Sequence, residues 1–243
     1  MKKSVLISIV LIIILSLCSV VNAYSTSNYS IDIPSTYESI TDGQFNDENG
    51  NGINIQVSDF KSSGDPYTQE NLDKLVDEIY TNIDQYRDQI AESLKETYGS
   101  YYTDEYIKNY VDSFKCNSID LKEITNVSKN NYKCFHIIAN YQMADYSYYC
   151  DQYQIVSANE MYTITVSAKE KADLQNDDIK KALESFTIAN FSAPANKENN
   201  TIKYIAIGAA CGAVAGLLSY FFNKNRKNKN DNNINNNDNN VNQ

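Results

Sequence analysis

Hydrophobic positions after residue 68 repeat at intervals of three and four. The set is Leu72, Val76, Ile79, Ile83, Tyr86, Ile90 and Leu94. This spacing places them on one face of a helix, and Thr68 is a suitable N-cap. We expect one helix running to about Tyr98, ended by Gly99, and a shorter helix over about 103–114. The spacing also fits a coiled coil, but we interpret it as a helix lying on a sheet.

Elsewhere the hydrophobic residues alternate, which is typical of half-buried strands. Residues 29–34 form one such segment, and residues 43–45 and 53–57 flank an Asn-Gly turn that predicts a hairpin. Further strands are expected in series, followed by a helix and a last short strand: 119–127, 132–143, 148–156, 161–168, 173–185 (helix) and 186–189. This order predicts an α+β fold in which helices cover an antiparallel meander.

Matching the apolar faces of neighbouring strands predicts their register. A three-residue turn at 144–146 places Phe135 opposite Ile155. A two-residue turn at 159–160 then places Ile155 opposite Ile164. One continuous apolar face results, which the long helix can cover.

Residues 1–23 have the layout of a secretory signal peptide. Lys2 and Lys3 precede the apolar run 5–17, and Val21-Asn22-Ala23 resembles a cleavage site for signal peptidase. Two alternatives stay open: a retained N-terminal anchor, or a lipoprotein with Cys18 as its first residue. The next 177 residues, 24–200, are expected to form an extracytoplasmic domain.

A second apolar segment, residues 203–222, predicts a transmembrane helix. Residues 204–222 contain no charge, and a helix of about 20 residues spans the ~30 Å hydrocarbon core. Basic residues follow directly, so the positive-inside rule places the C-terminus in the cytoplasm. The segment also carries Gly208, Gly212 and Gly216 on one helix face, where small residues allow close packing. We expect this face to mediate homodimer formation or docking to a partner transmembrane helix, although small residues are also simply tolerated in lipid.

Charge and composition narrow the function classes. The chain carries 21 basic and 31 acidic residues for a net charge of −10, and it has a single His. Residues 24–200 carry a net charge of −15, whereas residues 201–243 carry +3. Binding to phosphate backbones needs Lys and Arg, so nucleic acid is excluded as a partner. The lack of a His/Cys cluster excludes most zinc sites, and no cofactor is expected.

The last 21 residues, 223–243, include 12 Asn and are expected to form a disordered cytoplasmic tail. Such a composition suits an AT-rich bacterial genome, and an Asn-rich eukaryotic source remains an alternative. In that case four sequons would be glycan acceptors: Asn28, Asn126, Asn190 and Asn199.

The order of elements, with Tyr-Ser-Ile-Asp-Ile-Pro at the start and Ile179-Lys-Lys-Ala-Leu-Glu-Ser-Phe-Thr-Ile at the end, resembles the PsbP-like family. The resemblance covers about residues 28–190. It implies an α/β/α sandwich in a small exported protein that binds other proteins, and it carries over no catalytic residue. The helical region 68–114 is longer than the minimal pattern of that family.

Three candidate sites remain. Asp47, Asn49 and Asn51 match the first half of a calcium loop, but the Glu expected at its twelfth position is missing, and a hairpin turn explains the same residues. His136 is the one residue around which a hydrolase of the Ser–His–Asp type could be built, although no nucleophile motif accompanies it. A structural role is the simpler interpretation of this His.

The third candidate is a recognition surface rich in tyrosine: Tyr98, Tyr101, Tyr102, Tyr106, Tyr110, Tyr146, Tyr148 and Tyr149. Tyr offers a large contact area at low entropic cost. The same residues could instead fill the core of a chain that has no Trp.

The domain has three cysteines, Cys116, Cys134 and Cys150. The register above separates Cys134 from Cys150 by about 20 Å along the strands and places Cys116 several residues beyond the level of Cys150. Bridged Cα atoms lie within ~7 Å, so we expect no disulfide among them.

Together these patterns predict a single-pass membrane protein with its N-terminal domain outside the cell and its tail in the cytoplasm. We expect that domain to bind an extracellular protein without catalysing a reaction. The alternatives are a cell-surface hydrolase that uses His136 and an accessory subunit of a membrane complex.

Overall fold

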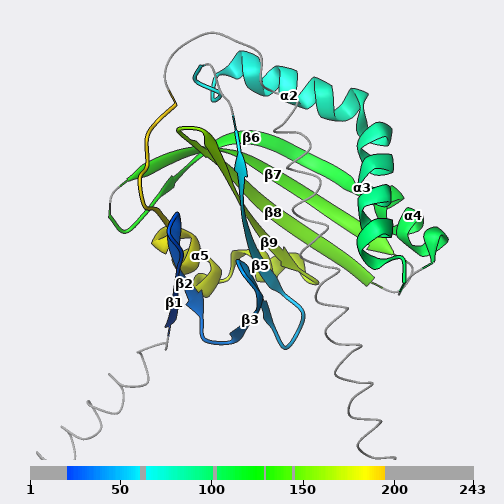
Figure 1. The fold of residues 1–243 in the computed structure, drawn as a ribbon, viewed down its shortest axis with the longest axis horizontal. Coiled ribbons are helices and arrows are strands. Elements are labelled where there is room, and N and C mark those ends of the chain that lie inside the picture. The colour runs from blue at the N-terminus through cyan, green and yellow to red at the C-terminus, as the bar shows by residue number, and fades with distance from the viewer. Residues whose placement is uncertain (1–20, 61–63, 101–102, 129, 144–145, 195–243) are drawn as a thin grey trace, which may run out of the picture.

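The computed structural model describes residues 21–60, 64–100, 103–128, 130–143 and 146–194, which form two antiparallel sheets and a set of helices (Figure 1). The larger sheet has the strand order β3-β4-β5-β9-β8-β7-β6. Its strands are β3 (Tyr37–Thr41), β4 (Gln44–Asp47), β5 (Gly52–Asp59), β6 (Lys115–Thr125), β7 (Asn131–Met143), β8 (Tyr146–Ser157) and β9 (Glu160–Ala168). The expected α+β class with an antiparallel meander is confirmed.

A small sheet covers one face of the large sheet. It consists of β1 (Val21–Ser25), β2 (Tyr29–Pro34) and β10 (Thr187–Ile188), and α5 (Asp177–Ser185) lies beside it after the short 3-10 helix η1 (Lys171–Gln175). Ile31 and Ile33 of β2 and Ile179 of α5 join Ile155 and Ile164 of the large sheet in one buried cluster. We call this side of the large sheet the α5 face.

Three helices lie on the opposite side of the large sheet, which we call the α3 face. They are α2 (Gln69–Thr81), α3 (Ile83–Tyr98) and α4 (Asp104–Asp112). Leu75 and Ile79 of α2 pack on Phe135, while Ile90 of α3 and Tyr110 of α4 belong to a second cluster at the other end of the strands. Figure 1 shows α2 along β6, with α3 turning away from it toward α4.

The expected single helix from Thr68 to Tyr98 is wrong, because the helical stripe is interrupted at Asn82. The backbone of Asn82 leaves the helical region at φ −110° and ψ 17°, and its side-chain Nδ2 donates to the carbonyl of Glu78 at 3.2 Å. An Asn side chain that bonds to the local backbone competes with the helical pattern. The predicted cap is confirmed, since the Thr68 side chain accepts from Asn71 N at 3.2 Å.

The predicted register between β7 and β8 is off by one residue. Phe135 pairs with Gln154 instead of Ile155, because Met143 pairs with Tyr146 and leaves a two-residue connection. A shift of one residue exchanges the faces. Phe135 therefore lies on the α3 face, whereas Ile155 lies on the α5 face, and the single continuous apolar face does not exist.

The predicted register between β8 and β9 is off by two residues, since Ile155 pairs with Tyr162. An even shift preserves the faces, so Ile155 and Ile164 do share the α5 face, as expected. The predicted strand over 29–34 is confirmed as β2, and the predicted hairpin as β4 and β5. The sequence analysis did not anticipate β1 or β3.

The two predicted membrane segments fall mainly outside the described residues. Residues 1–20, and with them most of the predicted signal peptide, are not described, but Val21, Asn22 and Ala23 pair with β2 inside β1. The segment 203–222 and the tail 223–243 are not described either. Within the described ranges, no helix has the length and hydropathy that a membrane span requires.

Candidate functional site

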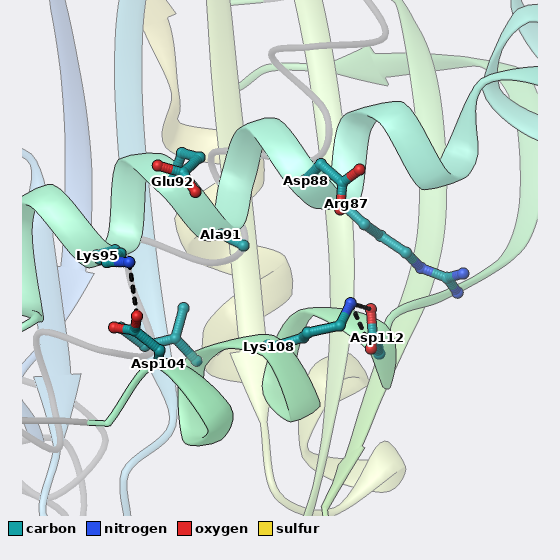
Figure 2. A pocket seen from close by; sticks show the side chains of 9 residues that line it. Arg87, Asp88, Ala91, Glu92, Lys95, Asp104, Lys108 and Asp112 are labelled. Carbon is teal, nitrogen blue, oxygen red and sulfur yellow. Dashed lines mark hydrogen bonds and ion pairs between the residues drawn. The ribbon is translucent and has the colours of Figure 1, made fainter.

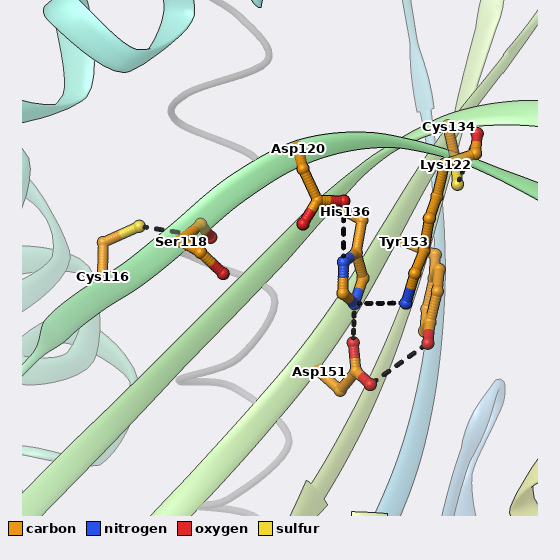
Figure 3. A network of polar contacts seen from close by, with 8 residues as sticks. All are labelled: Cys116, Ser118, Asp120, Lys122, Cys134, His136, Asp151 and Tyr153. Atoms are coloured by element: carbon orange, nitrogen blue, oxygen red, sulfur yellow. Dashed lines mark hydrogen bonds and ion pairs between the residues drawn. The ribbon is translucent and has the colours of Figure 1, made fainter. Parts of the chain in front are cut away.

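His136 lies at the centre of a polar cluster on the α5 face of β6, β7 and β8 (Figure 3). The antiparallel register places Asp120 of β6 and Tyr153 of β8 directly opposite His136. The imidazole is held on both sides. Its Nδ1 lies 3.1 Å from Asp120 Oδ1, and its Nε2 lies 2.5 Å from Asp151 Oδ1. The ring therefore links three neighbouring strands through two carboxylates.

Two further groups complete this His136 cluster. Lys122 Nζ lies 3.3 Å from His136 Nε2 and 5.6 Å from the centre of the Tyr153 ring. The hydroxyl of Tyr153 donates to Asp151 Oδ2 at 3.1 Å. Burial, followed by the nearby Asp151 carboxylate, raises the pKa of Tyr153, so this phenol remains a neutral donor. Two carboxylates and two basic side chains thus face one another at the rim of the core.

The partners of His136 point to a structural role. Both ring nitrogens face carboxylate oxygens, and Lys122 Nζ also lies 3.3 Å from Nε2, so these three side chains occupy both polar edges of the ring. A general base needs a ring nitrogen without a proton, and a nucleophile within hydrogen-bond reach of it. Among the described residues, the polar partners of the ring are these two carboxylates and Lys122. The hydrolase alternative would need His136 to exchange one carboxylate for a substrate or a nucleophile.

The three cysteines are free thiols, two of them fully buried. Burial raises the pKa to about 11 for Cys116 and to about 12 for Cys134 and Cys150. Cys134 lies on the α5 face, opposite Lys122, whereas Cys116 and Cys150 lie on the α3 face, on either side of Ala139. The expectation that Cys116 lies several residues beyond Cys150 is wrong. The two are level but two strand spacings apart, ~9.5 Å, which exceeds the reach of a disulfide.

The candidate calcium loop forms the turn between β4 and β5. Asp47 uses both carboxylate oxygens within the turn: Oδ1 accepts from Asn51 N at 2.8 Å and Oδ2 from Asn51 Nδ2 at 2.9 Å. Gly50 adopts φ +91°, a conformation that favours glycine. Asn51 in turn accepts from Lys169 N at 3.4 Å, and Asn49 is exposed. The hairpin geometry accounts for Asp47 and Asn51.

The candidate tyrosines whose side chains the structure describes do not gather on one exposed surface. Tyr110 and Tyr148 are fully buried, and Tyr110 stacks on Tyr141 with ring centres 4.9 Å apart. Tyr106 and Tyr149 are half-buried. Tyr101 and Tyr102 lie outside the described residues, as do the side chains of Tyr98 and Tyr146. For Tyr110 and Tyr148, the alternative of core tyrosines is therefore correct.

A groove of about 450 Å³ runs between α3 and α4 (Figure 2). Four of its charged side chains form two ion pairs: Lys95 Nζ lies 2.6 Å from Asp104, and Lys108 Nζ lies 3.2 Å from Asp112. Arg87 donates to the Phe114 carbonyl at 2.7 Å. Exposed ion pairs of this kind contribute about 0–1 kcal/mol each, so the groove is a solvated helix interface.

A feature that the sequence analysis missed is a row of buried polar side chains on the α3 face. Strand pairing aligns Asn54 of β5 with Thr165 of β9, and Thr165 with Gln152 of β8. Gln152 Nε2 donates to Thr165 Oγ1 at 3.0 Å, and Gln154 Nε2 donates to Gln152 Oε1 at 3.3 Å. We call the set the polar strip: Gln44, Asn46, Asn54, Gln152, Gln154, Thr163, Thr165 and Ser167, all buried. Alternation at Thr163, Thr165 and Ser167 was the available signal.

Two further sets of candidates can be placed only in part. Gly208, Gly212 and Gly216 lie outside the described residues. Of the four sequons, Asn126 is 3% exposed, and its Nδ2 donates to Phe186 O and to the hydroxyls of Tyr132 and Thr187. A glycan on that nitrogen would displace these bonds, so Asn126 is a structural residue of the folded domain.

Comparison with known proteins gives no family for the chain. No protein-family model and no curated protein matches it. A crystal structure from Bacteroides thetaiotaomicron is similar with a TM-score of 0.36 and 8% identity, over 67% of this chain and 45% of that chain. The protein of unknown function PA94 from Pseudomonas aeruginosa is similar with a TM-score of 0.21 and 13% identity, over 63% and 85%. The chain thus spans less than half the length of the Bacteroides protein.

Proposed function

We propose that this chain is a membrane-anchored binding domain that acts outside the cell and performs no catalysis. The observation that carries the proposal is the contrast between the two faces of the large sheet. The α5 face is covered by β2 and α5, whereas the α3 face carries the buried polar strip beside the helices α2 to α4. Rows of amide and hydroxyl groups on a rigid sheet are suited to recognition.

The reactive side chains support a binding role over a catalytic one. The ring nitrogens of His136 face carboxylates, and the thiols of Cys134 and Cys150 have a pKa near 12, so they are not nucleophilic at neutral pH. The membrane anchor rests on the uncharged segment 204–222 and the basic residues that follow it. The resemblance to the PsbP-like family likewise rests on the sequence alone and is part of the proposal.

Membrane topology can be tested by cysteine labelling in intact cells. Val127 is 72% exposed and suits the position of a reporter thiol, Val127→Cys. We expect a membrane-impermeant maleimide to label Val127→Cys in intact cells, and to label Asn236→Cys only after permeabilisation. The parent chain is the matched control, because its domain thiols are largely or fully buried. Labelling of Val127→Cys only after permeabilisation would refute the outward orientation.

The hydrolase alternative is tested separately. A fluorophosphonate or other activity-directed probe should leave the purified full-length protein unlabelled. Covalent labelling that disappears in His136→Gln would instead favour the hydrolase.

A further inference from the structure

The polar strip is buried, although the described helices lie over other strands. Gln154 is 0% exposed and Thr165 is 3% exposed. Yet α2 lies along β6, and α4 against β7 (Figure 1). In the described hydrophobic clusters, helices α2 to α4 meet β8 near its two ends, at Tyr148 and Cys150 and at Val156. The strip across β4, β5, β9 and the middle of β8 therefore needs a cover from chain outside the described ranges.

One atom of the strip also lacks a hydrogen-bond partner. Asn46 is 5% exposed, and its Oδ1 is buried without a partner within the described part of the chain. An unsatisfied buried acceptor costs about 1–3 kcal/mol, so a donor is expected to face it. Asn46 lies beside Gly52 and Ser167: a Cβ on Gly52 would lie 2.9 Å from Ser167 Oγ and 3.3 Å from Asn46 Nδ2.

The described chain ends at the turn between β8 and β9, on the side of the α5 face. Ser192 N donates to Ser157 Oγ at 3.0 Å, and Ala158 N donates to the Ser192 carbonyl at 2.9 Å, which fixes the exit of the chain at the turn between β8 and β9. Nine residues, 195–203, then precede the apolar segment. As a helix, residues 204–222 would be ~28 Å long, close to the ~30 Å of the nine-residue strand β9.

We propose that residues 204–222 dock as a helix on the polar strip, so that the domain shelters its own apolar segment whenever that segment is not in a membrane. Gly208, Gly212 and Gly216 would give this helix a face on which the backbone approaches the sheet closely. A carbonyl in a helix keeps a second lone pair. The carboxamide of Gln152 has two N–H groups, of which Thr165 accepts one. The other can donate to a helix carbonyl, which a glycine face exposes and an apolar side chain would cover.

The inference goes beyond the proposed function, because docking and membrane spanning are alternative states of the same 19 residues. In the membrane the segment faces lipid and the strip is open to a ligand. In the docked state the strip is occupied. The domain would then bind its own segment 204–222 until that segment inserts into the membrane, and insertion would expose the polar strip to a ligand.

Site-specific photo-crosslinking of the full-length chain tests the proposal. A diazirine amino acid is placed at Leu217 during cell-free synthesis without membranes, and the linked peptides are identified by mass spectrometry. We expect links from position 217 to peptides of β5, β8 or β9. A diazirine at Asn236 in the tail is the control and should give at least fivefold fewer such links. Mixed heavy and light chains distinguish a link within one chain from a link between copies.

A paired substitution tests whether the strip is the receptor. Thr165→Lys places a charge in the middle of the strip and should lower the yield of links at least fivefold. Thr125→Lys, at an exposed position on β6, should leave the yield unchanged. Near-ultraviolet circular dichroism of the tyrosines verifies that both variants are folded.

Three outcomes would overturn the proposal: links only between copies, links only to the helices α2 to α4, or an unchanged yield in folded Thr165→Lys. Synthesis in the presence of lipid vesicles should reduce the links as the segment inserts. The cysteine-labelling test reports membrane topology alone. If labelling gives the expected topology but no crosslink forms, docking is rejected and the membrane anchor is retained. If the crosslink forms but labelling contradicts the topology, the anchor is rejected and docking is retained.

Discussion

Removing the imidazole of His136 should destabilise the domain, because the buried carboxylate of Asp151 loses a hydrogen-bond partner. His136→Leu keeps an apolar side chain at the position but removes one hydrogen-bond partner of Asp151, whose side chain is 10% exposed and also accepts from the Tyr153 hydroxyl. Removal of one partner from a buried ion pair costs about 3–5 kcal/mol. For a domain of 150–250 residues, each kcal/mol lowers Tm by roughly 2–4 °C, so we expect a fall of about 6 °C or more.

The other carboxylate supplies a matched control. Asp120 bonds to the same ring, but its side chain is 49% exposed. An exposed pair contributes about 0–1 kcal/mol, so Asp120→Asn should cost no more than ~1 kcal/mol. Thermal unfolding of the full-length protein in detergent, followed by tyrosine circular dichroism, measures both variants.

The sign of a second substitution provides the sharper test. In the His136→Leu background, Asp151→Asn removes the buried charge and should raise Tm, although the same change lowers Tm in the wild type. Opposite effects of the same substitution in the two backgrounds would show that His136 and Asp151 are energetically coupled, as expected for residues in contact. The reasoning fails if Asp151→Asn lowers Tm in both backgrounds, or if Asp120→Asn is as damaging as His136→Leu.

Three other substitutions or conditions give defined outcomes. Gly43 adopts φ +70°, and a Cβ there would lie 2.5 Å from the Ile55 carbonyl oxygen, so Gly43→Ala should lower the free energy of unfolding by about 1–3 kcal/mol; a neutral result in urea titration would contradict this. Thr68→Ala removes the N-cap of α2 and should cost ~1 kcal/mol by the same titration, whereas Thr125→Ala, which caps no helix, should not. Burial raises the pKa of Cys134 and Cys150 from 9.0 to about 12, so their contribution to stability is complete below pH 9.0 and is lost as the pH rises toward about 12. Iodoacetamide at pH 8 should leave both thiols unmodified in the native protein, and mass spectrometry of either a carbamidomethylated or a disulfide-linked form would refute the assigned burial.

The sequence by itself determined the elements of this protein where the signal was local. The alternating segment 29–34, the Asn-Gly hairpin after Asp47 and the N-cap at Thr68 follow from neighbours within a few residues, and each has its expected structure. The uncharged segment 204–222 and the acidic composition of residues 24–200 are likewise properties of the chain alone. These two properties are sufficient to propose a membrane-anchored domain without knowledge of its packing.

Tertiary structure alone decided which face each strand presents. Strand β7 has hydrophobic residues on both sides, so alternation could not distinguish its two faces, and a turn shorter by one residue moved Phe135 away from Ile155. The same shift brings His136 level with Tyr153. The separate two-residue shift between β8 and β9 aligns Gln152 with Thr165. The His136 cluster and the polar strip are sets of residues far apart in sequence. Their geometry depends on register, which the two-residue period of a strand leaves undetermined when both faces are buried.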